Sequence, residues 1–276
     1  MARPLIDVAD LADLVERGDP VTILDVRYRM GGPPGPEEFA AGHVPGASYV
    51  DLDTDLASPP GLRGRHPLPD SAAFEAAMRR VGVSNGRPVV VYDDWSAHAA
   101  ARCWWLLRHH GHRDVRVLDG GWAAWTAAGL PVATGGEAEA APGNFTAHTG
   151  DLTTVTAGNV QGVSIVIDAR APERYRGEVE PIDPVAGHIP GAVNVPTARN
   201  LGPDGRFLPA ADLKATYAEV GAVAGADIAV YCGSGVTAAH DVLALEVAGV
   251  AAALYPGSWS EWVADPGRPV ATSARP

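Results

Sequence analysis

A cysteine directly follows an apolar run in the segment VYCGSGVTAAH, residues 230–240. The run before it has the composition of a buried strand, and the alanine-rich stretch after it is typical of a helix. The connecting loop has no charge, and Gly233 and Gly235 allow the backbone to curl closely around the sulfur. Backbone N–H groups and the positive end of the helix dipole can then point at Cys232, which favours a thiolate. The segment predicts a nucleophilic cysteine.

The alternative for Cys232 is the usual one for a free cysteine, a small buried hydrophobic side chain. That interpretation is the better one for Cys103, which lies between apolar residues in the predicted helix AARCWWLL. Two cysteines are too few for a disulfide framework or a thiolate zinc site. The histidines of RHHGH, residues 108–112, could bind a metal, but histidine also suits a helix end, and we expect no metal and no cofactor.

The chain contains the same pattern twice. ILDVR (23–27) with AGHVPGA (41–47) returns as VIDAR (166–170) with AGHIPGA (186–192). The distance between the copies far exceeds a solenoid repeat, so we expect a duplicated domain. VVVYDDW likewise matches IAVYCGS, which places Asp93 where the second copy has Cys232.

In each copy short β-branched runs alternate with helical stretches, which predicts an α/β fold with a mainly parallel sheet covered by helices on both faces. Ligands of such sheets bind at the carboxyl ends of strands, where Cys232 is expected. Around residue 140 the periodicity is lost and glycine, proline and acidic residues increase, as in an exposed linker. We expect an N-terminal domain over 1–134, a linker over 135–150 and a catalytic domain over 151–276.

The composition excludes several classes of partner. The chain has 276 residues and a formal net charge of −12, which disfavours binding to nucleic acid and to anionic lipid. No apolar run reaches the roughly 18 residues of a membrane span. The acidic, amphipathic N-terminal stretch does not look like a signal peptide, so we expect a cytoplasmic protein.

The loop CGSGVT, the two GHxPGA motifs, the DxR after an early strand in each half and the tandem layout resemble the two-domain rhodanese-like sulfurtransferases over nearly the whole chain. The resemblance implies two tandem rhodanese-like domains, the first without a catalytic cysteine. The loop is most similar to that of 3-mercaptopyruvate sulfurtransferases, because thiosulfate sulfurtransferases usually carry basic residues there. Charge agrees, since a loop without lysine or arginine suits a monoanionic donor better than the thiosulfate dianion. Tyrosine phosphatases are disfavoured because their loop ends in arginine.

The resemblance implies that Cys232 takes sulfur from 3-mercaptopyruvate, releases pyruvate and holds the sulfur as a persulfide. A thiol such as thioredoxin or a low-molecular-weight thiol, or cyanide, would then accept it. The loop residues implied to bind the substrate are Gly233, Gly235, Val236 and Thr237.

Arg174 occupies the family position for binding the donor's carboxylate and ketone. The alternative is a surface ion pair with Glu173 or Glu178. Related enzymes often have a second arginine before GHIPGA, but this chain has none there, which leaves Arg176 or Arg206 as substitutes.

Three further residues match family positions assigned to leaving-group protonation or thiol activation. Ser234 lies in the loop, and His66 and Asp53 come from the first copy of the repeat. The alternatives are a turn-capping aspartate and a solvated loop imidazole.

Motifs present in both copies are interpreted as structural, because only one copy has the cysteine. They include His43, His188, Asp25 and Asp168. With Asp93 in place of a thiol, the first copy is expected to be a scaffold. Ser258 and Glu261 have the spacing of a capping box, with Trp259 and Trp262 forming a core face.

Two alternative functions remain open from sequence. One is thiosulfate sulfurtransferase activity, and the other is a non-enzymatic sulfur carrier or interaction module.

Overall fold

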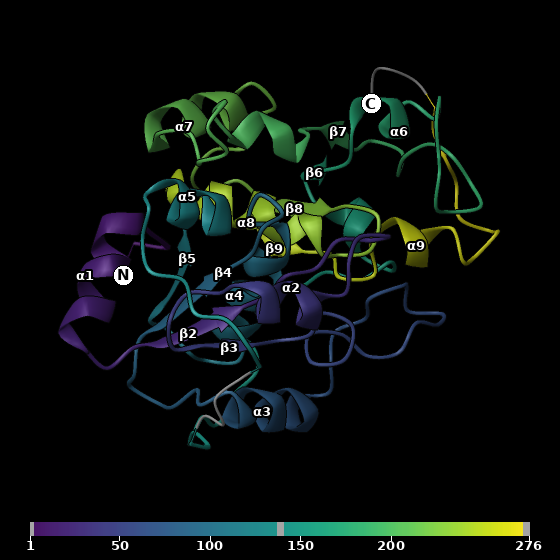
Figure 1. Cartoon of the computed structure of the whole chain (residues 1–276). Helices are drawn as coiled ribbons and strands as arrows, with labels where there is room; N and C mark the ends of the chain where they lie inside the picture. The colour runs from purple at the N-terminus through teal and green to yellow at the C-terminus, as the bar shows by residue number, and fades with distance from the viewer. Residues whose placement is uncertain (1–2, 137–140, 273–276) are drawn as a thin grey trace. The chain divides into compact units, whose positions relative to one another are not determined.

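The computed structural model describes residues 3–136 and 141–272 and divides them into two compact units (Figure 1). The first unit comprises the described residues up to Ser58, Pro69–Leu152 and Asp204–Arg206. The second comprises Pro59–Leu68, Thr153–Pro203 and the described residues from Phe207 onward. Residues 137–140 of the predicted linker lie outside the described residues.

The first unit is built on a parallel sheet of short, β-branched strands in the order β1-β5-β4-β2-β3. The strands are β1 (Leu5–Ile6), β2 (Thr22–Asp25), β3 (Ala47–Tyr49), β4 (Val89–Tyr92) and β5 (Val115–Leu118). Its helices are α1 (Val8–Arg17), α2 (Gly35–Ala41), α3 (Ser71–Arg80), α4 (His98–His109) and α5 (Gly121–Ala127). Figure 1 shows α3 and α5 on opposite sides of β2 and β4, as expected for a sheet covered on both faces.

The second unit repeats this topology with the strand order β7-β6-β8-β9. The strands are β6 (Ile165–Asp168), β7 (Val193–Asn194), β8 (Ile228–Tyr231) and β9 (Ala253–Leu254). The helices are α6 (Pro172–Tyr175), α7 (Ala210–Ala218), α8 (Thr237–Val247) and α9 (Ser258–Trp262), with 3-10 turns η1 (Val160–Gly162) and η2 (Thr197–Asn200). Thr154 bridges Leu254 in parallel where β1 pairs with β5 in the first unit. The predicted duplication and the predicted α/β fold are confirmed.

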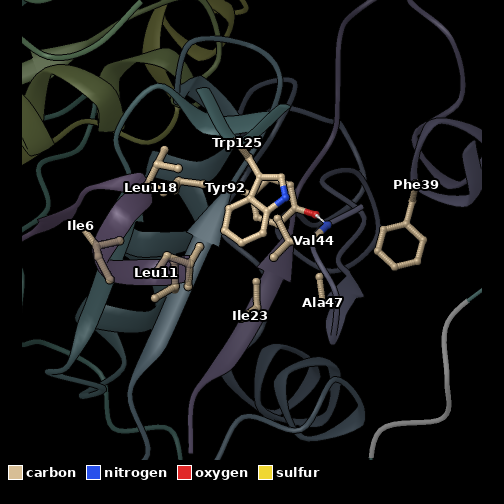
Figure 2. Packing of buried hydrophobic residues seen from close by; sticks show 11 residues of the cluster. Ile6, Leu11, Ile23, Phe39, Val44, Ala47, Tyr92, Leu118 and Trp125 are labelled. Carbon is tan, nitrogen blue, oxygen red and sulfur yellow. Dashed lines mark hydrogen bonds between the residues drawn. The ribbon is translucent and has the colours of Figure 1, made fainter. Parts of the chain in front are cut away.

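A core cluster joins α1, α2 and α5 to the first sheet (Figure 2). Leu11, Phe39 and Trp125 are almost fully buried against it, and each such side chain contributes about 1.5–3 kcal/mol. The backbone N–H of Val44 donates to the hydroxyl of Tyr92 over 3.0 Å, which ties the chain after α2 to the end of β4.

The second half of the predicted linker packs on the first unit. Phe145 is buried with its ring edge-on to Phe74, and Gly143 N–H donates to the carbonyl of Arg79 over 2.8 Å. Phe145 therefore anchors this segment to the first unit, while most of residues 141–150 are exposed.

The DxR motif forms the same buried ion pair in both units. Asp25 binds Arg27, and Asp168 binds Arg170 through Nε at 3.0 Å and Nη2 at 2.6 Å. Burial by itself lowers the pKa of Arg170, but the charge and hydrogen bonds of Asp168, together with the nearby Tyr231 and Glu180, outweigh burial, so that the pKa is raised. Each arginine also donates to a backbone carbonyl of the following GHxPGA segment, at Gly42 and Gly187. The motif fastens that segment to the strand end, which is a structural role as predicted.

The repeated histidines are structural too. Nδ1 of His43 contacts the carbonyl of Phe39, and Nδ1 of His188 contacts the carbonyl of Tyr175. Each imidazole also stacks on the side-chain ring of that same partner residue, with the two ring centroids 3.8 Å apart. Cys103 is buried in α4, and burial raises its pKa, so this thiol stays protonated.

The histidines near the end of α4 contact backbone oxygens. His109, His110 and His112 lie 2.8, 2.9 and 3.2 Å from carbonyl groups. Among residues 3–136 and 141–272 no group of three or more metal-binding side chains is suited to a metal ion. Within the same ranges no helix is both long and apolar enough to cross a bilayer.

Replacing Asp25 with alanine should lower the free energy of unfolding of the first unit by about 3–5 kcal/mol, because Arg27 would remain buried without its carboxylate. The matched control is Asp13→Ala, which removes an exposed ion pair with Arg17 and should cost less than about 1 kcal/mol. Urea unfolding followed by tryptophan fluorescence measures both, and equal midpoints would contradict the structural role.

Candidate active site

Cys232 lies at the carboxyl end of β8, directly after Tyr231, which pairs with Asp168 of β6. Its side chain is 1% exposed, and the backbone N–H of Gly235 donates to Sγ over 3.1 Å. Helix α8 begins at Thr237, after Val236, so the loop turns around the sulfur before the helix starts. This arrangement can stabilise negative charge on sulfur.

Gly235 has the backbone conformation that the tight loop requires. Its φ of +78° lies in the left-handed region, and a Cβ there would be 2.2 Å from the carbonyl oxygen of Pro256. A side chain at this position would push the loop away from the segment before α9.

Ser258 holds the backbone of the cysteine loop through its side-chain hydroxyl. Its Oγ accepts a hydrogen bond from Cys232 N–H over 3.1 Å and donates to the carbonyl of Tyr255 over 2.9 Å. Because a hydroxyl has one proton, Ser258 holds the loop backbone and is not the principal donor to Sγ, which lies 4.0 Å away. The predicted capping box is wrong: α9 starts after Gly257 without a side-chain cap, and Ser258 has a φ of +53°.

The first turn of α9 also supports the loop. Backbone N–H groups of Trp259 and Ser260 donate to the carbonyls of Cys232 and Gly233 over 3.0 and 2.9 Å. These are helix donors without partners inside the helix. Trp259 and Trp262 are buried, as the predicted core face requires.

Residues 59–68 belong to the second unit although they precede most of the first in sequence. The backbone N–H of Arg65 donates to Ser260 Oγ over 3.0 Å. Gly64 has a φ of +101°, and a Cβ there would be 2.7 Å from the carbonyl oxygen of Gly257. The close approach of Gly64 therefore seats this segment on the start of α9.

His66 and Ser234, both predicted site residues, are in contact. His66 Nδ1 lies 2.8 Å from Ser234 Oγ, and both side chains are less than 10% exposed. Asp53 belongs to the first unit, where its N–H donates to Asp51 Oδ1, and burial together with the charge of Asp51 raises its pKa. The role of Asp53 toward the cysteine stays a prediction.

Arg174 lies beside the cysteine loop. Both of its Nη atoms are 3.6 Å from the position of a Cβ on Gly233. Its side chain binds Glu180 through Nη2 at 2.6 Å and Nε at 3.2 Å, and Nη2 is 3.4 Å from Asp183. The predicted alternative, a pair with Glu173 or Glu178, is wrong, because the 180–183 turn supplies the carboxylates.

Both predicted substitutes for a second arginine are paired with neighbouring carboxylates, and their role toward the donor stays a prediction. Arg176 is bound to Glu178, and Arg206 belongs to the first unit, where it pairs with Asp204. Sequence reasoning missed Arg65, whose Nη2 is 3.2 Å from the position of a Cβ on Gly233. The one feature of the sequence that could have indicated Arg65 is that it directly precedes His66, a predicted site residue.

Six charged side chains form an alternating series, here called the ion chain. The links between successive members measure 2.6, 3.3, 2.6, 3.4 and 2.8 Å. The members in order are Asp168, Arg170, Glu180, Arg174, Asp183 and Arg65. The three carboxylates neutralise the three guanidinium groups, so the chain brings no excess charge to the cysteine loop.

In the first unit a carboxylate takes the place of the sulfur. Asp93 accepts 2.9 Å hydrogen bonds from the backbone N–H groups of Trp95, Ala97 and Ala100. Burial raises the pKa of Asp93 to about 6. The donors that could surround a thiolate are used by this side chain, as expected of a scaffold copy.

Gly64→Ala should displace residues 59–68 from the second unit. The cost of a left-handed alanine alone is about 1–2 kcal/mol, so trypsin should cut after Arg63 and Arg65 at least about fivefold faster. Gly61→Ala is the control, because a Cβ there meets no atom within 4 Å. Equal cleavage of the two variants would contradict the seating of this segment.

Comparison with known proteins agrees with the architecture. The rhodanese-like domain family model matches residues 7–128 and 154–265. The chain is 48% identical to the putative thiosulfate sulfurtransferase SseB of Mycobacterium tuberculosis, with 96% of each chain covered. It is 45% identical to the probable 3-mercaptopyruvate sulfurtransferase of Pseudomonas aeruginosa, with 97% of this chain and 98% of that protein covered.

A solved structure shows the same fold. The crystal structure of SseA from Escherichia coli, titled as one of the 3-mercaptopyruvate sulfotransferases, covers 94% of this chain and all of its own, with a TM-score of 0.81 and 32% identity. Two family matches, full-length relatives and a common fold lead to one conclusion: this chain belongs to the rhodanese-like family and contains two rhodanese-like domains.

Proposed function

We propose that this protein is a 3-mercaptopyruvate sulfurtransferase that transfers sulfur through a persulfide on Cys232. The observation that carries the proposal is the uncharged loop around Cys232, in which the N–H of Gly235 donates to the sulfur. The same contact would stabilise the thiolate before the reaction and the anionic persulfide after it.

The choice of donor rests on charge. The relative from M. tuberculosis bears a thiosulfate name and the relative from P. aeruginosa a 3-mercaptopyruvate name, so names do not decide it. The loop has no basic residue, and two arginines beside it, Arg65 and Arg174, are paired with the carboxylates of Asp183 and Glu180. A dianion such as thiosulfate would find little excess positive charge, whereas a keto acid needs one carboxylate contact.

The proposed first half-reaction moves one sulfur atom from the donor to Cys232. The Cys232 thiolate attacks the donor sulfur, and a sulfur–sulfur bond forms as the donor's carbon–sulfur bond breaks. The electron pair of the broken bond goes to carbon and produces the enolate of pyruvate. The outer sulfur of the new persulfide first carries the proton of the donor's thiol group. The persulfide loses this proton and the enolate carbon gains one, so the products are pyruvate and an anionic persulfide.

Ser234 and His66 can move that proton. Their 2.8 Å contact links a hydroxyl in the cysteine loop to an imidazole, and such a pair can both accept and donate a proton. Arg174 would contact the donor's keto acid group. In the second half-reaction a thiol, such as that of thioredoxin or of a small thiol, attacks the outer sulfur and regenerates the Cys232 thiolate.

Thiosulfate sulfurtransferase activity is the second candidate. The 48% identical relative favours it, and so does the presence of two guanidinium groups at Gly233. The two candidates differ in the donor and share the cysteine.

The ratio of kcat/KM for 3-mercaptopyruvate to that for thiosulfate, with cyanide as acceptor, tests the proposed function. We expect a ratio well above one, because the site has no excess positive charge to match the two negative charges of thiosulfate. A clear preference for thiosulfate would establish the second candidate instead.

Cys232→Ser should abolish pyruvate release from 3-mercaptopyruvate, because the attacking sulfur is lost. Cys103→Ser is the matched control and should retain most of the activity, since this thiol is buried in α4 and stays protonated. Equal loss in the two variants would contradict the assignment of the nucleophile.

His66→Ala and Ser234→Ala should each lower kcat about 10²- to 10⁴-fold, the usual contribution of a general acid–base group. Because the two side chains share one hydrogen bond, the double variant should lose little more than either single variant. Steady-state kinetics measures this, and multiplicative losses would show that the residues act separately.

A further inference from the structure

A fully buried polar cluster joins helix α8 to helix α7 and to the 3-10 turn η2 in the second unit. Its members are His240 and Asp241 of α8, Tyr217 of α7 and Asn200 of η2, each 0% exposed. The proposed reaction uses none of them. A buried carboxyl group is costly unless a cation pairs with it or it loses its charge, so the state of Asp241 decides how the cluster is held together.

Asn200 lies at the centre of the cluster. Its Nδ2 donates to Asp241 Oδ1 over 2.7 Å and lies 3.4 Å from His240 Nδ1. An amide nitrogen can only donate, so Nδ1 of His240 accepts and carries no proton. Although this atom lies 3.8 Å from Asp241 Oδ1, it therefore does not offer the carboxyl group a positive partner.

Two oxygen atoms of the cluster have no hydrogen-bond partner in the part of the chain that the structure describes. They are Asn200 Oδ1 and Asp241 Oδ2, and they belong to the two groups that the 2.7 Å bond already joins. Two acceptors cannot satisfy each other, but a proton on Asp241 Oδ2 turns that atom into a donor. A carboxylic acid and a primary amide can then form two hydrogen bonds side by side, and neither oxygen is left unsatisfied.

The surroundings of Asp241 oppose its ionisation. Burial has the largest effect on its pKa, and it outweighs the hydrogen bonds from Asn200 and Tyr217, which favour the carboxylate. The negative charge of Asp168 acts in the same direction as burial. The pKa of Asp241 is therefore raised well above its usual value.

The elements packed against α8 bring other titratable groups, and these are paired or exposed. Arg199 of η2 is bound to Glu219 at 2.7 Å, and Lys214 of α7 is exposed. Strand β8 contributes Tyr231, whose hydroxyl accepts from the backbone N–H of Ile189, and strand β9 contains no titratable residue. None of these groups offers Asp241 a buried cation.

We propose that Asp241 keeps its proton in the folded protein at neutral pH and donates it to Asn200 Oδ1. Helix α8 is then held to η2 by a neutral acid–amide pair, which is broken when alkaline pH removes the proton. Because α8 begins at Thr237, directly after the cysteine loop, this pair makes the packing of that helix sensitive to alkaline pH. The device does not depend on which sulfur donor the protein uses.

The direction of the pH effect follows from the folded and unfolded states. In the unfolded chain an aspartate loses its proton near about pH 4, whereas Asp241 in the folded chain keeps it. The folded state therefore binds one more proton above that pH, and its stability falls as the pH rises. Through this group each pH unit lowers the folding equilibrium constant about tenfold, until Asp241 in the folded chain itself ionises.

The test is urea unfolding of the wild type and of Asp241→Asn at several pH values. The new amide can accept from Asn200 and donate to Asn200 Oδ1, but it cannot ionise. We expect the folding equilibrium constant of the variant, divided by that of the wild type, to rise about 100-fold between about pH 5 and about pH 7. Groups that titrate alike in both proteins cancel in this ratio.

Asp212→Asn is the matched control, because it removes a carboxylate from an exposed position on α7. Its ratio to the wild type should stay within about threefold over the same pH range. A ratio for Asp241→Asn that is as flat as the control would overturn the proposal. So would an Asp241→Asn variant that is less stable than the wild type by the same factor at every pH, because the folded protein would then need the charged carboxylate.

Infrared spectroscopy observes the proton directly. At about pH 8, where ordinary aspartates are ionised, the wild type should still show the carbonyl band of a protonated carboxylic acid. The band should disappear in Asp241→Asn and shift in Asn200→Ala, because the acid then lacks its acceptor. A wild type without the band would reject the proposal even if Asp241→Asn failed to fold, and so would a band that neither variant changes.

Discussion

The ion chain is the interaction on which the arrangement around Cys232 depends. Its first link, Asp168 to Arg170, has the same geometry as Asp25 to Arg27 in the other unit and fastens a strand end to the GHxPGA segment. In the second unit Glu180 and Asp183 extend it to Arg174 and Arg65 beside the cysteine loop. Because the inner carboxylates are only 3–4% exposed, removing one would leave buried guanidinium groups uncompensated. The chain therefore couples the stability of the second unit to the position of Arg174, which is proposed to contact the donor.

The two units show how one scaffold supports two outcomes. In the first unit Asp93 directly follows β4, and in the second unit Cys232 directly follows β8. Backbone N–H groups donate to the side chain of each of these residues. In the first unit Asp93 supplies its own negative charge and takes three of these donors. In the second unit Cys232 supplies a sulfur, and Gly235 and Ser258 keep the loop tight without adding charge. The two units thus share one fold, and the nucleophile is a local difference between them.

Sequence predicted the features that repeat or that lie close together along the chain. The duplicated motifs were enough for the α/β fold, and the strand, loop and helix around Cys232 were enough for its position at a strand end. Arg65 and Ser258 could not be found this way, because both are distant from the cysteine loop in sequence and come close to it only in the folded chain. Ser258 even has the spacing of a capping box, and only the positive φ of the residue shows that the backbone takes another course. The partners of Arg174 were also missed, since an ion pair with an adjacent glutamate looks the same in sequence as one with Glu180.

The central claim is that Cys232 carries the transferred sulfur and that a keto acid delivers it. The most direct measurement is the intact-protein mass after brief exposure to 3-mercaptopyruvate or to thiosulfate, before and after addition of a thiol acceptor. We expect the wild type to gain the mass of one sulfur atom with 3-mercaptopyruvate and to lose it when the acceptor is added. The variant with serine in place of Cys232 should show no gain. A gain with thiosulfate alone, or the same gain in the serine variant, would contradict the central claim.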